Sequence, residues 1–276
     1  MGALNDGEIT RGGVRIPALN AGPRTCLDIR QIGLTFSSGQ KSVTALEDIS
    51  LQVAENEFAV IVGPSGCGKS SLLYLTAGLL EPTSGEIRVN DKRIDGPGAD
   101  RGMVFQAYTL FPWLNVRDNV EYGLKRRRLP AAQRQEIVEY YLREVGLERF
   151  ADAWPRQLSG GMMQRVAIAR ALANDPDILL MDEPFGALDS QTRLSMQQLL
   201  LNVWGHNSKT VLFVTHDIDE AILLADRIYV MSGRPGVISR TLEVHLPRPR
   251  TSEIVMEKHF LDIKREILGI LHHDDT

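Results

Sequence analysis

The stretch that decides the fold is Gly63-Pro-Ser-Gly-Cys-Gly-Lys-Ser70. The run Phe58–Val62 before it is wholly apolar and rich in β-branched residues, which predicts a short strand buried on both faces of a parallel sheet. The glycines allow a tight turn in which successive backbone N–H groups face one anion. An apolar helix is expected to begin near Lys69, and its N-terminal dipole favours the same anion.

This loop is predicted to hold the phosphates of a nucleoside triphosphate. The Lys69 ammonium would reach the β- and γ-phosphates, and the Ser70 hydroxyl would bind Mg²⁺. Cys67 is needed there for its backbone N–H, so an incidental side chain is favoured over a redox or nucleophilic one. Together with one other cysteine, Cys26, it gives no disulfide framework. The residues assigned to the phosphate site are Gly63, Pro64, Ser65, Gly66, Cys67, Gly68, Lys69, Ser70 and Ser71.

A second apolar run, Ile178–Met181, ends in the adjacent carboxylates of Asp182 and Glu183. An isolated Asp-Glu pair is usually a solvated turn, but here it follows a predicted buried strand, at the strand end where α/β folds bind ligands. Neighbouring side chains on an extended chain point in opposite directions, so the two carboxylates can have different roles. We expect Asp182 to hold Mg²⁺ and Glu183 to be the general base that polarises the attacking water.

A third apolar run, Thr210–Thr215, is followed by His216. A lone histidine is more often a packing or surface residue. This one follows another predicted buried strand, so we expect it at the same edge of the sheet, in contact with the γ-phosphate.

Taken together, these motifs resemble the ATP-binding subunit of an ABC transporter, and the resemblance covers about residues 27–245. It implies ATP and Mg²⁺ as cofactors. It also implies that Phe36 stacks on adenine and that Gln106, in Val104-Phe-Gln106, senses Mg²⁺ and the γ-phosphate. The Mg²⁺ ligands would then be Ser70, Gln106 and Asp182.

The same resemblance extends to three more motifs along the chain. Leu158-Ser-Gly-Gly-Met-Met-Gln-Arg165 resembles the signature sequence, whose Ser159, Gly160 and Gly161 would touch the γ-phosphate held by a second copy. Asp189, in Gly186-Ala-Leu-Asp189, would lie in the loop that crosses the dimer interface. His216 would be the switch histidine, with Glu183, Gln106 and Lys69 completing the catalytic set. Met162 departs from the glutamine usual in the signature, which affects only a polar contact near the ribose.

The predicted fold is α/β: a P-loop NTPase core with a parallel sheet, an attached antiparallel β subdomain and a helical ABC subdomain. Residues 1–24 are expected to be a disordered leader. The ATP-binding domain is predicted over 25–245, with the helical subdomain at about 107–175 and helices at Ala131–Val145 and Met162–Ala173. The remaining residues, 246–276, form a C-terminal helical extension. Its apolar-striped helix over 253–271 is expected to pack on its own domain, with partner contact as the alternative.

Composition limits the classes of function. The formal net charge of −4 argues against a nucleic-acid binder, which needs a basic face. The run Lys125–Arg128 is expected to be a solvated surface, with anionic lipid as the second reading. No apolar stretch is long enough to span a bilayer, and the N-terminus has no signal-peptide pattern. We therefore expect a peripheral protein at the cytoplasmic face of the cell membrane, held there by its partners.

The expected partners are a second copy of the chain, integral membrane permease subunits and, indirectly, a periplasmic or lipid-anchored substrate-binding protein. Phe111, Trp113 and Leu114 suit a docking groove for a permease helix, and subdomain core is the alternative. Three segments resemble the importer branch for nitrate, sulfonates and taurine: Gly96–Gln106, Leu110–Leu114 and Ser232–Gly236. That branch also includes importers of bicarbonate and thiamine precursors, and a permease-free assembly ATPase stays open. An ABC ATPase acting on DNA is disfavoured, because no long coiled coil separates the two main motifs.

Overall fold

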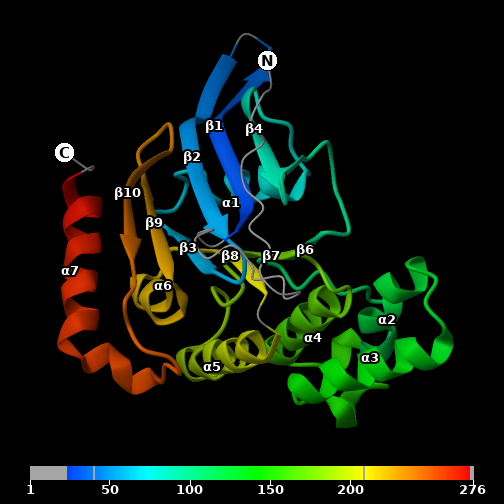
Figure 1. Ribbon diagram of the computed structural model, residues 1–276. Coiled ribbons are helices and arrows are strands. Elements are labelled where there is room, and N and C mark those ends of the chain that lie inside the picture. The colour runs from blue at the N-terminus through cyan, green and yellow to red at the C-terminus, as the bar shows by residue number, and fades with distance from the viewer. Residues whose placement is uncertain (1–23, 40, 208, 274–276) are drawn as a thin grey trace, which may run out of the picture.

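Two β-sheets form the centre of the computed structural model, which describes residues 24–39, 41–207 and 209–273 (Figure 1). The larger sheet has the strand order β10-β9-β3-β8-β7-β6. Its five strands from β9 to β6 are parallel, and β10 pairs antiparallel with β9 at one edge. In chain order the strands are β3 (Phe58–Val62), β6 (Arg101–Val104), β7 (Ile178–Asp182), β8 (Thr210–Thr215), β9 (Arg227–Ser232) and β10 (Val237–Glu243).

The apolar runs of the sequence become strands because both faces of this sheet are covered. Alternate residues of β3 enter two different cores: Val60 lies in one and Ile61 in the other, and both are fully buried. A strand that buries both faces cannot alternate polar with apolar residues. The predicted strands over 58–62 and 210–215 are therefore confirmed, and the strand predicted over 178–181 extends one residue further, to Asp182.

The smaller sheet is antiparallel and has the order β2-β1-β4-β5. It covers one face of the larger sheet together with α1, and their apolar side chains share one core. Its last two strands, β4 and β5, form an antiparallel hairpin. The strands are β1 (Thr25–Ser38), β2 (Lys41–Ala54), β4 (Ser84–Val89) and β5 (Lys92–Arg93).

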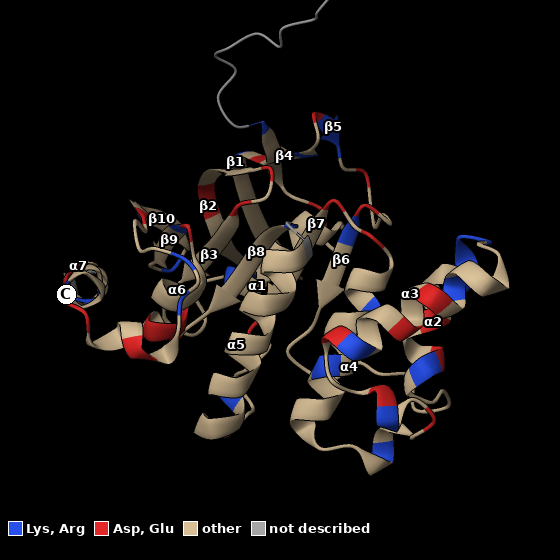
Figure 2. Ribbon diagram, turned by 60° about the horizontal axis from the view of Figure 1, so that its bottom comes forward, with Lys and Arg blue, Asp and Glu red and all other residues tan. Residues whose placement is uncertain are grey.

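The other helices contribute to the second core, on the opposite face of the larger sheet. Helices α2, α3 and α4 pack together at one end of the molecule, while α7 lies along β10 at the other end (Figures 1 and 2). The helices are α1 (Lys69–Ala77), α2 (Val116–Arg126), α3 (Ala131–Glu144), α4 (Gly160–Ala173), α5 (Ser190–Asn207), α6 (Ile218–Leu224) and α7 (Lys258–His273), with 3₁₀ turns at Glu148–Phe150, Pro155–Gln157 and Ser252–Met256.

Three helix predictions need correction. Helix α3 ends at Glu144, one residue before the predicted Val145, which is its C-cap. Helix α4 begins two residues before the predicted Met162, because the Ser159 hydroxyl accepts the Met162 N–H at 3.3 Å and so caps the helix. The single helix predicted over 253–271 is divided at Glu257, whose backbone is extended (ψ 143°). Phe260 and Ile267 of α7 are fully buried on the core, whereas Leu261 is on the exposed side.

The mixed α/β architecture confirms the predicted fold class. The proposed leader lies outside the described residues except for Arg24. No helix in the described ranges has both the length and the apolar character needed to cross a bilayer.

Candidate functional site

Four neighbouring parallel strands end at one edge of the larger sheet, and a predicted site residue follows or closes each of them. The loop 63–68 follows β3, His216 follows β8, Asp182 ends β7, and Gln106 comes two residues after β6. Carboxyl ends of parallel strands meet at the same edge, where open α/β sheets bind ligands. The topology therefore brings together residues that are distant in the sequence.

The loop 63–68 depends on glycine at defined positions. Gly66 and Gly68 have φ angles of +84° and +102°, which side chains rarely adopt. At Gly63 an added Cβ would lie 2.0 Å from the Met231 carbonyl oxygen, so only glycine lets this backbone approach β9. The loop leads directly into α1, whose N-cap is Gly68 and offers no capping side chain. The first N–H groups of α1 are thus available to an anion.

The Lys69 ammonium lies within this loop and is almost fully buried. Its Nζ donates to the carbonyl oxygens of Gly63 at 2.9 Å and Pro64 at 3.0 Å, and it lies 3.6 Å from Oε1 of Glu183. Such a position costs solvation, and neighbouring oxygens offset that cost. A phosphate entering the loop would meet a cation already fixed in place.

Ser70 and Asp182 meet across the edge of the sheet. The Ser70 Oγ donates to Asp182 Oδ1 at 2.8 Å, and Asp182 is 1% exposed. Tyr74, one turn after Ser70 on the same face of α1, lies beside Asp182 as well. Burial and the Asp182 carboxylate raise the pKa of the Tyr74 hydroxyl to about 12, so it stays protonated and able to donate.

Glu183 links the phosphate loop to the strand end of β8. Its Oε2 lies 2.9 Å from His216 Nδ1, while its Oε1 faces Lys69. Its φ of +39° is unusual for a residue with a side chain, and its N–H is held by the Val214 carbonyl at 2.9 Å. Backbone strain of this kind is concentrated at functional sites. Gln106 borders the same place: a Cβ on Gly186 would be 3.8 Å from Glu183 Oε2 and 3.9 Å from Gln106 Nε2.

Asp189 lies in the segment between β7 and α5, directly before α5 begins at Ser190. Its Oδ1 accepts the Thr192 N–H at 3.0 Å, and hydrogen bonds from Thr192 lower the pKa of the Asp189 carboxyl. Arg193 connects the same turn to the residue after His216. It donates to the Leu188 carbonyl at 3.1 Å and pairs with Asp217 at 3.4 Å.

The turn 158–161 is not part of this edge. No hydrogen bond or ion pair between described residues joins Ser159, Gly160 or Gly161 to the loop 63–71. The turn instead borders an open cavity of about 370 Å³, lined also by Phe150, Arg165, Gln191 and Thr192. Gly161 packs on Thr192, and Gly160 packs on the Tyr108 hydroxyl, two residues after Gln106.

Phe36 stands on the smaller sheet as an exposed aromatic side chain. It is 46% exposed and pairs across the strands with Val43, which is 63% exposed. Two residues further along β2, Ala45 and Leu46 lie against Gly68 of the loop. The pair is therefore an exposed apolar platform on β1 and β2, and β2 also contacts the loop.

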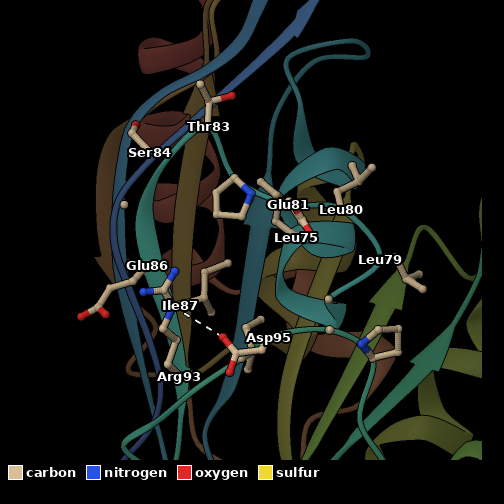
Figure 3. A pocket seen from close by; sticks show the side chains of 16 residues that line it. Leu75, Leu79, Leu80, Glu81, Thr83, Ser84, Glu86, Ile87, Arg93 and Asp95 are labelled. Atoms are coloured by element: carbon tan, nitrogen blue, oxygen red, sulfur yellow. Dashed lines mark ion pairs between the residues drawn. The ribbon is translucent and has the colours of Figure 1, made fainter.

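Another cavity, of about 710 Å³, lies between the end of α1 and the β4–β5 hairpin (Figure 3). It contains none of the predicted site residues. Arg93 and Asp95, which face each other in it, already form an ion pair at 3.7 Å. This cavity offers no cluster of catalytic side chains.

Sequence reasoning missed Tyr74 and Arg193 as neighbours of the site. The signal for Tyr74 was its spacing of four residues from Ser70 on a predicted helix, which places both on one face. Arg193 had no comparable signal, because its partner Asp217 is on a different helix cap.

Fold and site together define a P-loop nucleoside triphosphatase. The ABC transporter family model matches residues 46–186. The nitrate import ATP-binding protein NrtD of Synechocystis is 49% identical over 91% of this chain and 96% of its own length. The taurine import ATP-binding protein TauB of Pelagibacter ubique is 46% identical over 84% and 89%. A dimeric structure of an ATP-binding cassette in a post-hydrolysis state with ADP and Pi is 36% identical, has a TM-score of 0.70, and covers 80% of this chain and 100% of its own.

The chain belongs to the ABC transporter family. It is an ATPase of that family, and the resemblance to the nitrate, sulfonate and taurine branch is confirmed at the level of these relatives.

Proposed function

We propose that this chain energises a bacterial importer of a small anion or sulfonate, by closing as an ATP-bound dimer that moves a partner permease. The observation that carries the proposal is the meeting of Lys69, Glu183 and His216 at one sheet edge, next to a loop that leads to an exposed aromatic cluster. Lys69, Glu183 and His216 would supply ATP hydrolysis, and the aromatic cluster would supply a docking surface for a permease.

In the proposed chemistry, Glu183 is the general base. Its carboxylate accepts the proton of the attacking water, while its contact with His216 fixes the direction of the carboxylate. Lys69 binds the β- and γ-phosphates and stabilises the negative charge that develops on them. His216, now bound to Glu183, would turn one ring nitrogen to the γ-phosphate. Phe36 would stack on the adenine.

The residues fit Mg²⁺ at this edge. Ser70 and Asp182 offer hard oxygen atoms 2.8 Å apart, the ligand type that Mg²⁺ prefers, and Gln106 follows β6, the strand next to the one that ends in Asp182. No cluster of three or more His, Cys, Asp and Glu side chains in the described ranges could hold a metal alone. This suits Mg²⁺, which would bring ATP oxygens and water into its shell and neutralise phosphate charge.

A second copy of the chain would complete the site. Ser159, Gly160 and Gly161 lie at the start of α4, where backbone N–H groups can bind an anion, yet they border a cavity that their own phosphate loop does not line. In a head-to-tail dimer they would meet the γ-phosphate on the other copy's Lys69. Asp189, which is tied to Thr192 beside the same cavity, would cross the interface with them.

The permease would dock on an aromatic cluster formed by Phe111, Trp113 and Tyr122. The ring centroids of Phe111 lie 5.6 Å from Trp113 and 4.5 Å from Tyr122, and the Arg170 guanidinium lies 5.2 Å above Phe111. Trp113 is 67% exposed, which argues against the alternative that it is subdomain core. Exposed tryptophan and arginine are typical anchors of protein interfaces.

Part of the basic run near this cluster is already engaged within the chain. Lys125 contacts Asp118 and Glu121, each at 2.9 Å, and Arg127 donates to the Asn174 carbonyl at 2.7 Å. These contacts favour the solvated-surface interpretation over anionic lipid. Attachment to the cytoplasmic face of the membrane would then come from the permease.

Reconstitution tests this function. The chain is co-purified with the permease and the binding protein that are encoded by neighbouring genes. The complex is placed in vesicles with ATP and assayed for uptake of nitrate, taurine, bicarbonate and a thiamine precursor. We expect ATP-dependent uptake of nitrate or a sulfonate such as taurine. Uptake of only one of the other solutes contradicts the assigned substrate class, and failure to bind any permease contradicts the importer role.

A further inference from the structure

The connection between β9 and β10, residues 233–236, lies directly against the phosphate loop. A Cβ added at Gly236 would be 1.9 Å from the Cys67 carbonyl oxygen, so the two backbones touch there. On the other side, Gly63 makes its equally close approach to Met231 at the end of β9. The β9–β10 hairpin therefore holds the loop 63–68 at two points.

The same connection is anchored to β2. The Gly236 N–H donates to the Ala45 carbonyl at 2.9 Å, and the Glu47 N–H donates to the Gly236 carbonyl at 3.0 Å. These bonds fix residue 236 relative to the smaller sheet. A side chain carried by this connection therefore has a defined position over the phosphate loop.

That side chain is Arg234. Its Nη2 donates to the Ser65 carbonyl oxygen at 3.0 Å. The guanidinium also covers Gly66: a Cβ added there would lie 2.7 Å from Nη2 and 3.3 Å from Cζ. Glycine at 66 thus provides the space in which the arginine lies.

The hydrogen bond to Ser65 has a consequence for the next N–H group. In a planar trans peptide, the carbonyl oxygen and the following N–H point to opposite sides. A Ser65 carbonyl held toward Arg234 therefore turns the Gly66 N–H away from the arginine. Within residues 24–39, 41–207 and 209–273, this N–H has no acceptor, so it is free for a ligand.

The Arg234 guanidinium also differs from nearby arginines in its ion pairing. Other arginines of the region pair with carboxylates: Arg227 with Glu57 at 2.8 Å and Arg248 with Asp226 at 2.7 Å. Among the described residues, no carboxylate lies within ion-pair distance of Arg234. An unpaired cation beside an anion-binding loop adds to the favourable potential for phosphate.

We propose that Arg234 is a positioning residue for ATP, which holds the Ser65–Gly66 peptide in the orientation that binds phosphate. This inference rests on the proposed phosphate-binding role of residues 63–71. Arg234 acts through the loop backbone, whereas Lys69 contacts the phosphates. Since the loop holds the phosphates both before and during hydrolysis, Arg234 affects binding of ATP and ADP more than kcat.

The test is a titration of the full chain with fluorescent ATP and ADP, together with ATPase kinetics and melting without nucleotide. Arg234→Ala is expected to raise the Kd for both nucleotides and the KM for ATP about tenfold, the effect of one hydrogen bond from a charged donor. The kcat and melting temperature are expected to stay unchanged, because the side chain is exposed. Arg234→Lys, which retains a charged donor, is expected to restore most of the affinity.

Two controls separate the possible results. Arg240→Ala removes an exposed arginine of the same hairpin, on β10, and is expected to bind ATP normally. Equal losses in Arg234→Ala and Arg240→Ala would overturn the inference, as would normal affinity in Arg234→Ala while Lys69→Ala binds weakly. If Lys69→Ala itself binds ATP normally, the proposed phosphate site fails and the inference fails with it.

Discussion

Two segments of this chain lie at the start of a helix: residues 63–68, which precede α1, and residues 158–161, which include the first two residues of α4. Side chains of the same chain surround the first turn, with the Lys69 ammonium inside it and Asp182 and Glu183 beside it. The second turn borders an open cavity. The two helix starts therefore differ in their caps and in their surroundings: Gly68 is left-handed and has no capping side chain, whereas the Ser159 hydroxyl accepts the Met162 N–H.

These different surroundings indicate how the proposed site is divided between two copies of the chain. In the proposed site, one chain supplies at its sheet edge all the residues that bind the phosphates and activate the water. The signature turn, residues 158–161, lies instead where another molecule can reach it. Packing supports this placement, because Gly160 lies on Tyr108 and Gly161 lies on Thr192. The signature turn is therefore fixed to the loop of Gln106 and to α5, and both would move with it when a dimer closes.

The largest effect is expected when the proposed general base, Glu183, is removed from the sheet edge. Glu183→Gln keeps the shape of the side chain but loses its ability to accept a proton, so turnover should fall by about 10²- to 10⁴-fold while ATP binding is retained. The measurement is phosphate release with the permease present. The control is Glu144→Gln, because Glu144, at the end of α3, also contacts a histidine, His206, at 3.1 Å. Normal hydrolysis in Glu183→Gln removes Glu183 from the mechanism.

A smaller effect is expected at the permease surface, which belongs to neither turn. Trp113→Ala should lower transport in vesicles about tenfold or more, as loss of an interface anchor does, while the basal ATPase of the isolated chain stays normal. Trp154→Ala is the matched control, since Trp154 is also exposed (42%) but lies at a different turn. Loss of ATPase and melting temperature together would show that Trp113 supports the fold. Normal transport would place the docking surface elsewhere.

The smallest effect is expected at Tyr74, which lies beside Asp182 at the sheet edge. Tyr74→Phe removes the hydroxyl that lies beside Asp182, and the Mg²⁺ concentration needed for half-maximal ATPase should rise about threefold, as expected for one neutral hydrogen bond. Tyr140→Phe, on exposed α3, should have no effect. An unchanged Mg²⁺ requirement in Tyr74→Phe would mean that the hydroxyl does not help to orient Asp182.

Much of the site at the carboxyl end of the sheet could be predicted from the sequence, because its residues follow short apolar runs that are typical of strands buried on both faces. Phe58–Val62 and Thr210–Thr215 match the strands to the residue. Boundaries were less certain where a cap decides them, as at Ser159, or where the chain bends, as at Glu257.

Contacts between distant segments could not be predicted in this way. Arg234 was visible only as part of a motif typical of one branch, and its contact with Ser65 depends on how two glycines let β9 and the loop approach. The same holds for the link between Arg193 and Asp217. The division of the chain into a core, a helical subdomain at about 107–175 and an extension from 246 stays a prediction.

In the proposed dimer, the turn 158–161 of one chain completes the site of a second copy. Light scattering with ATP, in the Glu183→Gln background that is expected to slow hydrolysis, tests this model. We predict the mass of two chains with ATP and of one chain without it. Ser159→Arg, which places a bulky side chain at the turn, should abolish the dimer, while Ser252→Arg, at an exposed 3₁₀ turn near the C-terminus, should leave it intact. Melting temperatures check that both variants are folded. If no ATP-dependent dimer forms, or if the Ser159→Arg variant dimerises as well as its parent, the account is contradicted.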